Sequence, residues 1–229
     1  MLSEFKKKRS RLQTYTWLGL PLVVIGGWFY PKLGYILLGC MVGAIAVAVY
    51  KGRAWCDWMC PRGSFYDLFI QKISRNRKVP EFFRKKATRI AMLTILLSVL
   101  GSQIYIHWGD WNAVGLAMVT ILTVTTIVGI MLGVIYQQRI WCHVCPMGTI
   151  GNWISEGKMP LSIENTCVNC KICSKVCPMQ LNPYEFKANG VMGDNDCIKC
   201  ATCTVACPKK ALHFDDAKNV ELTDIKKAA

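Results

Sequence analysis

Two cysteine runs decide how this chain folds: CVNCKICSKVCP at residues 167–178 and CIKCATCTVACP at residues 197–208. Each run has three cysteines at two-residue gaps and a fourth cysteine three residues further on, directly before proline. Thiolates are soft ligands that suit zinc and iron–sulfur centres. A disulfide framework is the other common use of many cysteines, but these tight C-x-x-C runs are typical of metal sites. The two runs therefore indicate metal binding in a reducing compartment.

The spacing matches the bacterial ferredoxin run, in which three close cysteines bind one [4Fe-4S] cluster and the fourth binds the other cluster. We therefore predict two clusters whose fourth ligands are exchanged. The first cluster is predicted to bind Cys167, Cys170, Cys173 and Cys207, and the second Cys197, Cys200, Cys203 and Cys177. Zinc is disfavoured, because zinc sites seldom use three cysteines at two-residue gaps followed by a fourth before proline.

Four more cysteines belong to an internal repeat. RAWCDWMCPRGSF at residues 53–65 recurs as RIWCHVCPMGTI at residues 139–150, with one residue fewer between the cysteines. Four thiols from two repeats suit one shared metal site, made of Cys56, Cys60, Cys142 and Cys145. The pattern leaves three interpretations open: a third iron–sulfur cluster, a thiol or disulfide function, and structural zinc.

Four apolar stretches without interior charge occupy residues 14–30, 33–50, 90–107 and 113–137. A bilayer-spanning helix needs roughly 17 to 25 apolar residues, so we predict four transmembrane helices. Short turns join them into two hairpins. The predicted fold class is an α-helical membrane protein, with a four-helix membrane domain over residues 1–160 and a small α+β ferredoxin domain of the bacterial 2[4Fe-4S] type over residues 161–229.

The net charge of +14 is unevenly distributed. Residues 1–13 carry five Lys or Arg against one acid, and residues 51–89 carry eleven against three. Basic loops are retained on the cytoplasmic side of a membrane. We therefore predict a multi-pass protein of the inner (cytoplasmic) membrane, with both termini and the ferredoxin domain in the cytoplasm and the hairpin turns outside. Nucleic acid is not expected as a partner, because the bases flank apolar spans.

In these features the chain resembles the membrane ferredoxin family that includes the NapH quinol dehydrogenase subunit of periplasmic nitrate reductase systems. The resemblance rests on the four apolar stretches, the two C-x(2,3)-C-P motifs and the two ferredoxin runs, and it covers nearly the whole chain. The family's paired motifs are usually both C-x-x-x-C-P, so the shorter spacing from Cys142 to Cys145 is a departure.

The resemblance implies an electron-transfer subunit that passes electrons between the quinone or quinol of the membrane and a partner oxidoreductase of a respiratory complex. Such a subunit needs no catalytic residues of its own for bond-making chemistry. Related oxidase-maturation polyferredoxins imply an alternative function, a redox maturation factor that assists assembly of a respiratory metalloenzyme.

No residue is diagnostic of a quinone site. The candidates are polar and aromatic residues, which are His107, Asp110 and Trp111 at the outer turn and Arg139 and His143 at the inner face. Anchoring at the membrane interface and loop hydrogen bonding are the competing roles for these side chains.

Overall fold

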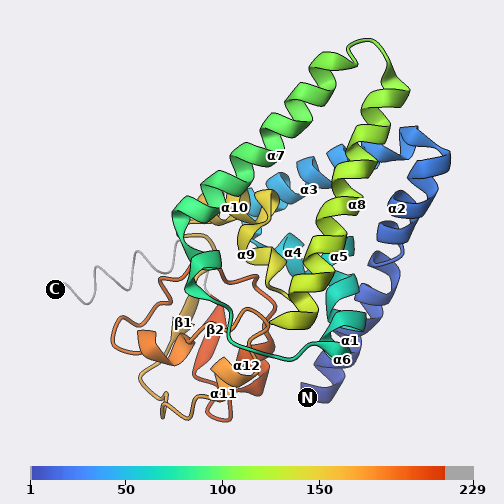
Figure 1. The fold of residues 1–229 in the computed structure, drawn as a ribbon. Coiled ribbons are helices and arrows are strands. Elements are labelled where there is room, and N and C mark those ends of the chain that lie inside the picture. The colour runs from blue at the N-terminus through green and yellow to red at the C-terminus, as the bar shows by residue number, and fades with distance from the viewer. Residues whose placement is uncertain (1, 215–229) are drawn as a thin grey trace.

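A bundle of long helices carries a smaller cysteine-rich domain at one end (Figure 1). The computed structural model describes residues 2–214. Residues 215–229 of the predicted ferredoxin domain therefore lie outside the described part of the chain. Within that part, the long helices come first in the sequence and the cysteine-rich domain follows from residue 161.

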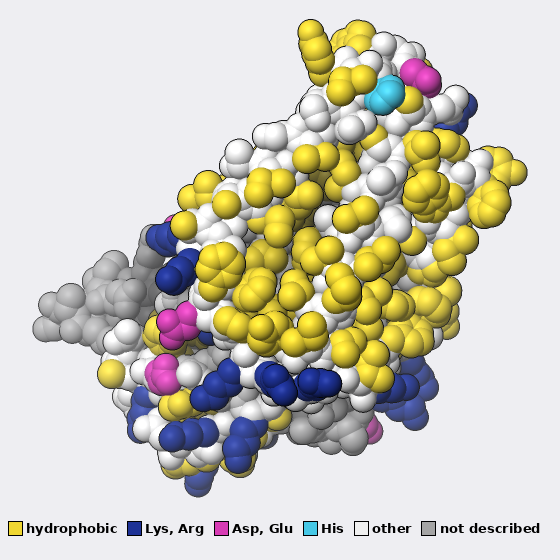
Figure 2. Space-filling model, viewed as in Figure 1, with side chains coloured by type: hydrophobic (Ala, Val, Ile, Leu, Met, Phe, Trp, Pro, Cys, Tyr) yellow, Lys and Arg dark blue, Asp and Glu magenta, His cyan; other side chains and the backbone are white. Residues whose placement is uncertain are grey.

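Three helices are long and apolar enough to cross a membrane: Pro31–Lys51, Lys86–Ile106 and Trp111–Ile135. The first consists of a 3-10 turn, η1 (Pro31–Tyr35), continued by α3 (Ile36–Lys51), and the other two are α7 and α8. Only 6% to 28% of the residues in their apolar windows are buried within the chain. Helices that are apolar all round and face outward suit lipid as solvent, and Figure 2 shows a broad hydrophobic band over this region.

The first predicted span, residues 14–30, is divided in the structure. Helix α1 (Leu2–Thr16) ends before a turn at residues 17–18, and α2 (Gly19–Phe29) continues from there and packs along α8. Pro21 explains the break, because its ring excludes the carbonyl of residue 17 from a regular helical position and it has no N–H to donate. Spanning by a fourth helix therefore remains a prediction.

The two predicted hairpins pack against each other through close backbone approach. A side chain at Gly34 would collide with the carbonyl of Gly115, and a side chain at Gly115 would collide with the carbonyl of Pro31. Small residues at such crossings allow apolar helices to come into direct contact. The hairpin turns, at residues 30–31 and 107–110, lie on the side away from the cysteine-rich domain (Figure 1).

At the opposite end, each repeat motif folds into short helices around its cysteines. The second cysteine of each pair, Cys60 or Cys145, is extended and precedes a helix that begins with proline, where the missing N–H is not needed. The helices of the first repeat and the loop after it are α4 (Ala54–Trp58), α5 (Pro61–Phe65), the π-helical turn η2 (Tyr66–Ile70), α6 (Gln71–Ile73) and η3 (Glu81–Arg84). Those of the second are α9 (Trp141–Val144) and α10 (Pro146–Ile154).

The cysteine-rich domain is built on one two-stranded antiparallel sheet. Strand β1 (Leu161–Ile163) pairs with β2 (Leu212–Phe214), so the sheet joins the two ends of the described domain. Its short helices are α11 (Ile172–Lys175), the 3-10 turn η4 (Pro183–Phe186) and α12 (Thr202–Ala206). The buried core combines apolar side chains with the thiols of Cys173, Cys200 and Cys203.

Polar contacts dock this domain onto the helical bundle. Arg84 donates to the carbonyls of Met179 and Gln180, both at 3.0 Å, and Gln137 donates to Pro178 O at 2.6 Å. Each of these carbonyls belongs to the turn after Cys177, so that turn is held in place by the bundle.

Candidate metal centres

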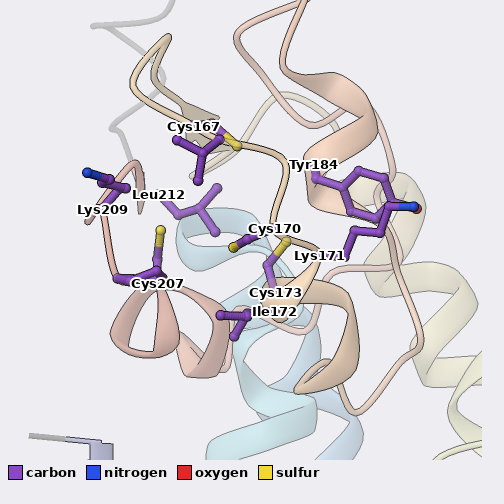
Figure 3. A pocket seen from close by; sticks show the side chains of 11 residues that line it. Cys167, Cys170, Lys171, Ile172, Cys173, Tyr184, Cys207, Lys209 and Leu212 are labelled. Carbon is purple, nitrogen blue, oxygen red and sulfur yellow. The ribbon is translucent and has the colours of Figure 1, made fainter.

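Four cysteines surround a pocket in the cysteine-rich domain (Figure 3). Cys167, Cys170 and Cys173 come from the first run, and Cys207 ends the second run. Cys170 is exposed at the protein surface. We call this space the distal pocket.

A second pocket is lined by Cys177, Cys197, Cys200 and Cys203. We call it the proximal pocket, because charged side chains of the helical part act on its thiols: Arg53 on Cys197, and Asp57 and Arg9 on Cys200. Cys173 of the distal pocket is among the thiols that help to raise the pKa of Cys203. The structure thus brings together the two exchanged sets of cysteines, while their ligation of iron remains a prediction.

The backbone of both runs suits an anionic occupant. Left-handed φ angles occur at corresponding places in and just after each run, at Asn169, Lys171 and Gln180 and again at Lys199, Ala201 and Lys210. A non-glycine residue in this conformation carries a conformational strain energy of about 1–3 kcal/mol. Alternating right-handed and left-handed residues turn successive N–H groups into a concave anion site, as in many iron–sulfur proteins. The repeated strain therefore fits a cluster with a negatively charged sulfur shell.

The cysteines surround spaces and do not meet at a point. Among residues 2–214, no three His, Cys, Asp or Glu side chains converge as the ligands of a single metal ion do. Burial raises the pKa of Cys177 to about 11 and that of Cys200 to about 12. These two free thiols are therefore protonated at neutral pH, and metal binding has to displace their protons.

A third group of thiols lies where the two repeats meet. Every pair among its members interacts electrostatically, which places Cys56, Cys60, Cys142 and Cys145 around a common region. Burial raises the pKa of Cys60 to about 12 and that of Cys142 to about 11. Cys56 and Cys142 also pack against the core of the cysteine-rich domain. We call this group the paired-cysteine site.

The two repeats exchange their arginines across this site. Arg53 of the first repeat donates to Cys142 O at 2.7 Å, and Arg139 of the second donates to Cys56 O at 2.7 Å. A Cβ on Gly148 would lie 2.8 Å from Arg53 Nη2, and one on Gly63 would lie 2.7 Å from Arg139 Nη1. The glycine of each motif therefore makes room for the guanidinium of the other.

Carboxylates neutralise Arg139 inside the protein. Its guanidinium is fully buried and lies 2.6 Å from Asp67 and 3.2 Å from Asp57, and Arg9 bridges the same two acids. Burial opposes ionisation of Asp67, but Arg139 and Arg9 hold its pKa below the ordinary value. Helix α1 is thereby tied to the motif of the first repeat.

Asp196 is the corresponding acid on the other side of the paired-cysteine site. It comes from the cysteine-rich domain, next to Cys197, and is 4% exposed. It accepts from Arg53 at 2.9 Å, from Asn152 at 2.8 Å and from Arg89 of α7. Three elements of the helical part thus converge on one carboxylate of the cysteine-rich domain.

The suggested quinone-site residues lie in two separate places. Asp110 caps α8 by accepting from the N–H groups of residues 112 and 113 at 3.0 and 3.2 Å, and His107 and Trp111 are exposed beside it. His143 is fully buried, with Nδ1 3.4 Å from Asp196 Oδ2, and burial lowers its pKa. The guanidinium of Arg139 already binds Asp57, Asp67 and the carbonyl of Cys56. The carboxylate of Asp110 already caps α8.

Sequence reasoning singled out the cysteines but missed Arg53, Asp57, Asp67 and Asp196 as partners of the site. The available signal was the arginine that opens each copy of the repeat. A further missed residue is Tyr66, fully buried with its hydroxyl unpaired among the described residues, for which Gly129 of α8 leaves space.

Two models of iron–sulfur domains match the chain. A 4Fe-4S binding domain matches residues 33–80 and 111–163, and each of these segments includes one repeat motif. A 4Fe-4S dicluster domain matches residues 166–212, which hold both ferredoxin runs. No solved structure matches the chain.

Curated relatives are similar over most of the chain. An uncharacterized protein of Methanocaldococcus jannaschii is 28% identical over 144 residues, which cover 60% of this chain and 56% of the relative. The methylamine utilization ferredoxin-type protein MauN of Methylobacillus flagellatus is 26% identical over 191 residues, or 74% of this chain and 66% of the relative. MauN of Methylorubrum extorquens is 28% identical over 162 residues, or 63% and 54%.

The chain spans about half to two thirds of the length of these relatives. The segments that the two models match together include all three groups of cysteines. The chain thus carries 4Fe-4S ferredoxin-type domains and is homologous to the MauN ferredoxin-type proteins.

Proposed function

We propose that this chain is a membrane-bound electron-transfer subunit that passes electrons between a quinone or quinol and a partner oxidoreductase. Three iron–sulfur clusters would carry the electrons, one each in the paired-cysteine site, the proximal pocket and the distal pocket. The clusters supply one-electron redox chemistry when bound. The protein holds them at fixed places and sets their charge environment.

The serial order of the three cysteine groups carries this proposal. The paired-cysteine site lies at the end of the apolar helices and packs against the cysteine-rich domain, where the proximal pocket comes next. The distal pocket follows, and its Cys170 reaches the surface. A lipid-soluble carrier arriving from the bilayer and a partner binding the exposed domain would therefore meet opposite ends of the series.

Substitution of the paired cysteines tests this proposal. Anaerobically purified protein is expected to hold about twelve iron atoms, four for each [4Fe-4S] cluster. Cys56→Ser or Cys142→Ser should lower this to about eight, keep the spectra of the ferredoxin clusters and slow their reduction by a quinol analogue at least tenfold. Cys40→Ser, in α3, is the matched control and should change neither quantity.

Unchanged iron content and unchanged reduction rates in both variants would exclude a relay at the paired-cysteine site. Stoichiometric zinc there would assign it a structural function. If deletion of the chain instead leaves a respiratory metalloenzyme without its metal, the maturation function is correct.

The proposed location is the inner membrane, with the cysteine-rich domain in the cytoplasm. Figure 2 shows Lys and Arg side chains gathered at the end of the bundle that carries this domain. Exposed bases at Lys72, Arg75, Arg77 and Lys78 support this location, because they lie in or beside the loop that contacts the domain, where Gln180 donates to Arg77 O at 3.0 Å. A phosphatase that is active only in the periplasm should be active when it is fused at Asp110. A fluorescent protein fused at Ala229 should fold in the cytoplasm. An active phosphatase at Ala229 would reverse this orientation.

A further inference from the structure

Arg53 lies between two of the cysteine groups. It precedes α4, and its side chain is among the largest that are fully buried, at 1% exposure. Its guanidinium donates to Cys142 O at 2.7 Å and to Asp196 Oδ1 at 2.9 Å. Cys142 belongs to the paired-cysteine site, and Asp196 directly precedes Cys197 of the proximal pocket. One side chain therefore connects the backbone carbonyl of a cysteine in one group to the carboxylate next to a cysteine of the other.

The charge of Arg53 also acts on the thiols of both groups. It interacts with Cys56 and Cys142 on one side and with Cys197 on the other. Gly148 leaves room for the guanidinium of Arg53 close to the paired-cysteine site, because any side chain at position 148 would displace that guanidinium. Asp196 neutralises part of the charge but is shared with Arg89. The arrangement leaves positive charge between the groups.

Arg139 is the counterpart of Arg53 and provides the contrast. It contacts Cys56 O at 2.7 Å and lies 3.9 Å from Cys142 Sγ, both in the paired-cysteine site. Its other partners are Asp57 and Asp67, which lie in the helical part of the chain. Among its contacts in the described chain, none is with the cysteine-rich domain.

We propose that Arg53 is a positioning residue shared by two iron–sulfur clusters, raising the reduction potentials of both the paired-cysteine site and the proximal cluster. This inference rests on the proposed function. Reduction adds one electron to a cluster, with no bond formed or broken, and the electron comes from the neighbouring cluster or a quinol. The added negative charge is stabilised by a buried cation nearby, since cluster potentials respond to local charge and hydrogen bonding.

Redox titrations of the anaerobically reconstituted full chain, followed by electron paramagnetic resonance, test this inference. Arg53→Gln should lower the potentials of two clusters, each by a tenfold or greater change in the reduction equilibrium, which is 59 mV for one electron. Arg139→Gln, the matched control, should lower the potential of the paired-cysteine site more than that of the proximal cluster, which Arg139 reaches, within the described chain, only through Asp57. A shift of only one cluster, or of neither, in Arg53→Gln would overturn the proposal.

Arg53→Lys covers the case in which the glutamine variant fails to assemble. Lysine keeps the charge but lacks the planar fork that joins Cys142 to Asp196, so both potentials should still move together, by less than in the glutamine variant. Movement of a single potential would contradict a shared role. Failure of the proposed function would be recognised separately, because the unmodified protein would then lack the paramagnetic resonance signal of a third cluster.

Discussion

Serine in place of Cys207 is expected to remove the distal cluster and leave the proximal cluster intact. Cys207 belongs to the second run in sequence, but it lines the distal pocket with Cys167, Cys170 and Cys173. Loss of one of four thiolates should release about four iron atoms, the content of one cluster. Iron analysis and paramagnetic resonance of the reduced protein would identify the cluster that is lost.

Cys177→Ser is the reciprocal variant and should remove the proximal cluster instead, because Cys177 lines the proximal pocket. It should also stop electrons from reaching the distal cluster. Cys207→Ser, by contrast, should leave electron transfer as far as the proximal cluster unchanged. Loss of the proximal cluster in Cys207→Ser, with the distal cluster kept, would show that each run binds its own cluster. The exchanged assignment would then be wrong.

Alanine in place of Asp196 is expected to destabilise the docking of the cysteine-rich domain by about 3–5 kcal/mol, because it leaves buried charges without their partner. The affected cations are Arg53 and Arg89, which lie in different parts of the helical bundle. Hydrogen exchange should accelerate throughout residues 161–214, and the clusters should be lost at lower denaturant concentration. Asn152 would also lose its acceptor.

The matched control is Glu156→Ala, which removes one exposed acid after α10 and should change stability by less than about 0.5 kcal/mol. Asp196→Asn should lie between the two, since it keeps hydrogen-bonding atoms but not the charge. Equal hydrogen exchange in Asp196→Ala and Glu156→Ala would show that the arginine contacts do not hold the domain.

The contribution of Asp196 should persist in mild acid. Burial opposes its ionisation, but His143, Arg53 and Arg89 together hold its pKa far below the ordinary value for an aspartate. A group with a lowered folded pKa stabilises the protein above its unfolded pKa, near 4, and loses that effect only as the pH falls toward the folded pKa. Docking should therefore be unchanged between pH 7 and about pH 5.

The sequence by itself was sufficient to predict the metal-binding character of the cysteine runs and the positions of the long apolar helices. Both signals are local: the gaps between cysteines set how many thiols a short loop presents, and the length of an apolar stretch sets what it can cross. The divided first helix was also signalled locally, by Pro21, although hydrophobicity alone predicted one span over residues 14–30. The exchanged grouping of Cys177 and Cys207 followed from a known pattern of spacing.

Tertiary structure alone decided what surrounds the paired-cysteine site. Arg53 and Cys142 are 89 residues apart in sequence, and Arg53 and Asp196 are 143 apart. No local pattern encodes which acid a buried arginine will meet, because that pairing depends on how the helices and the cysteine-rich domain pack. The spacing of the repeats predicted a shared site of four thiols, whereas the charges that set its electrostatic environment came together only on folding.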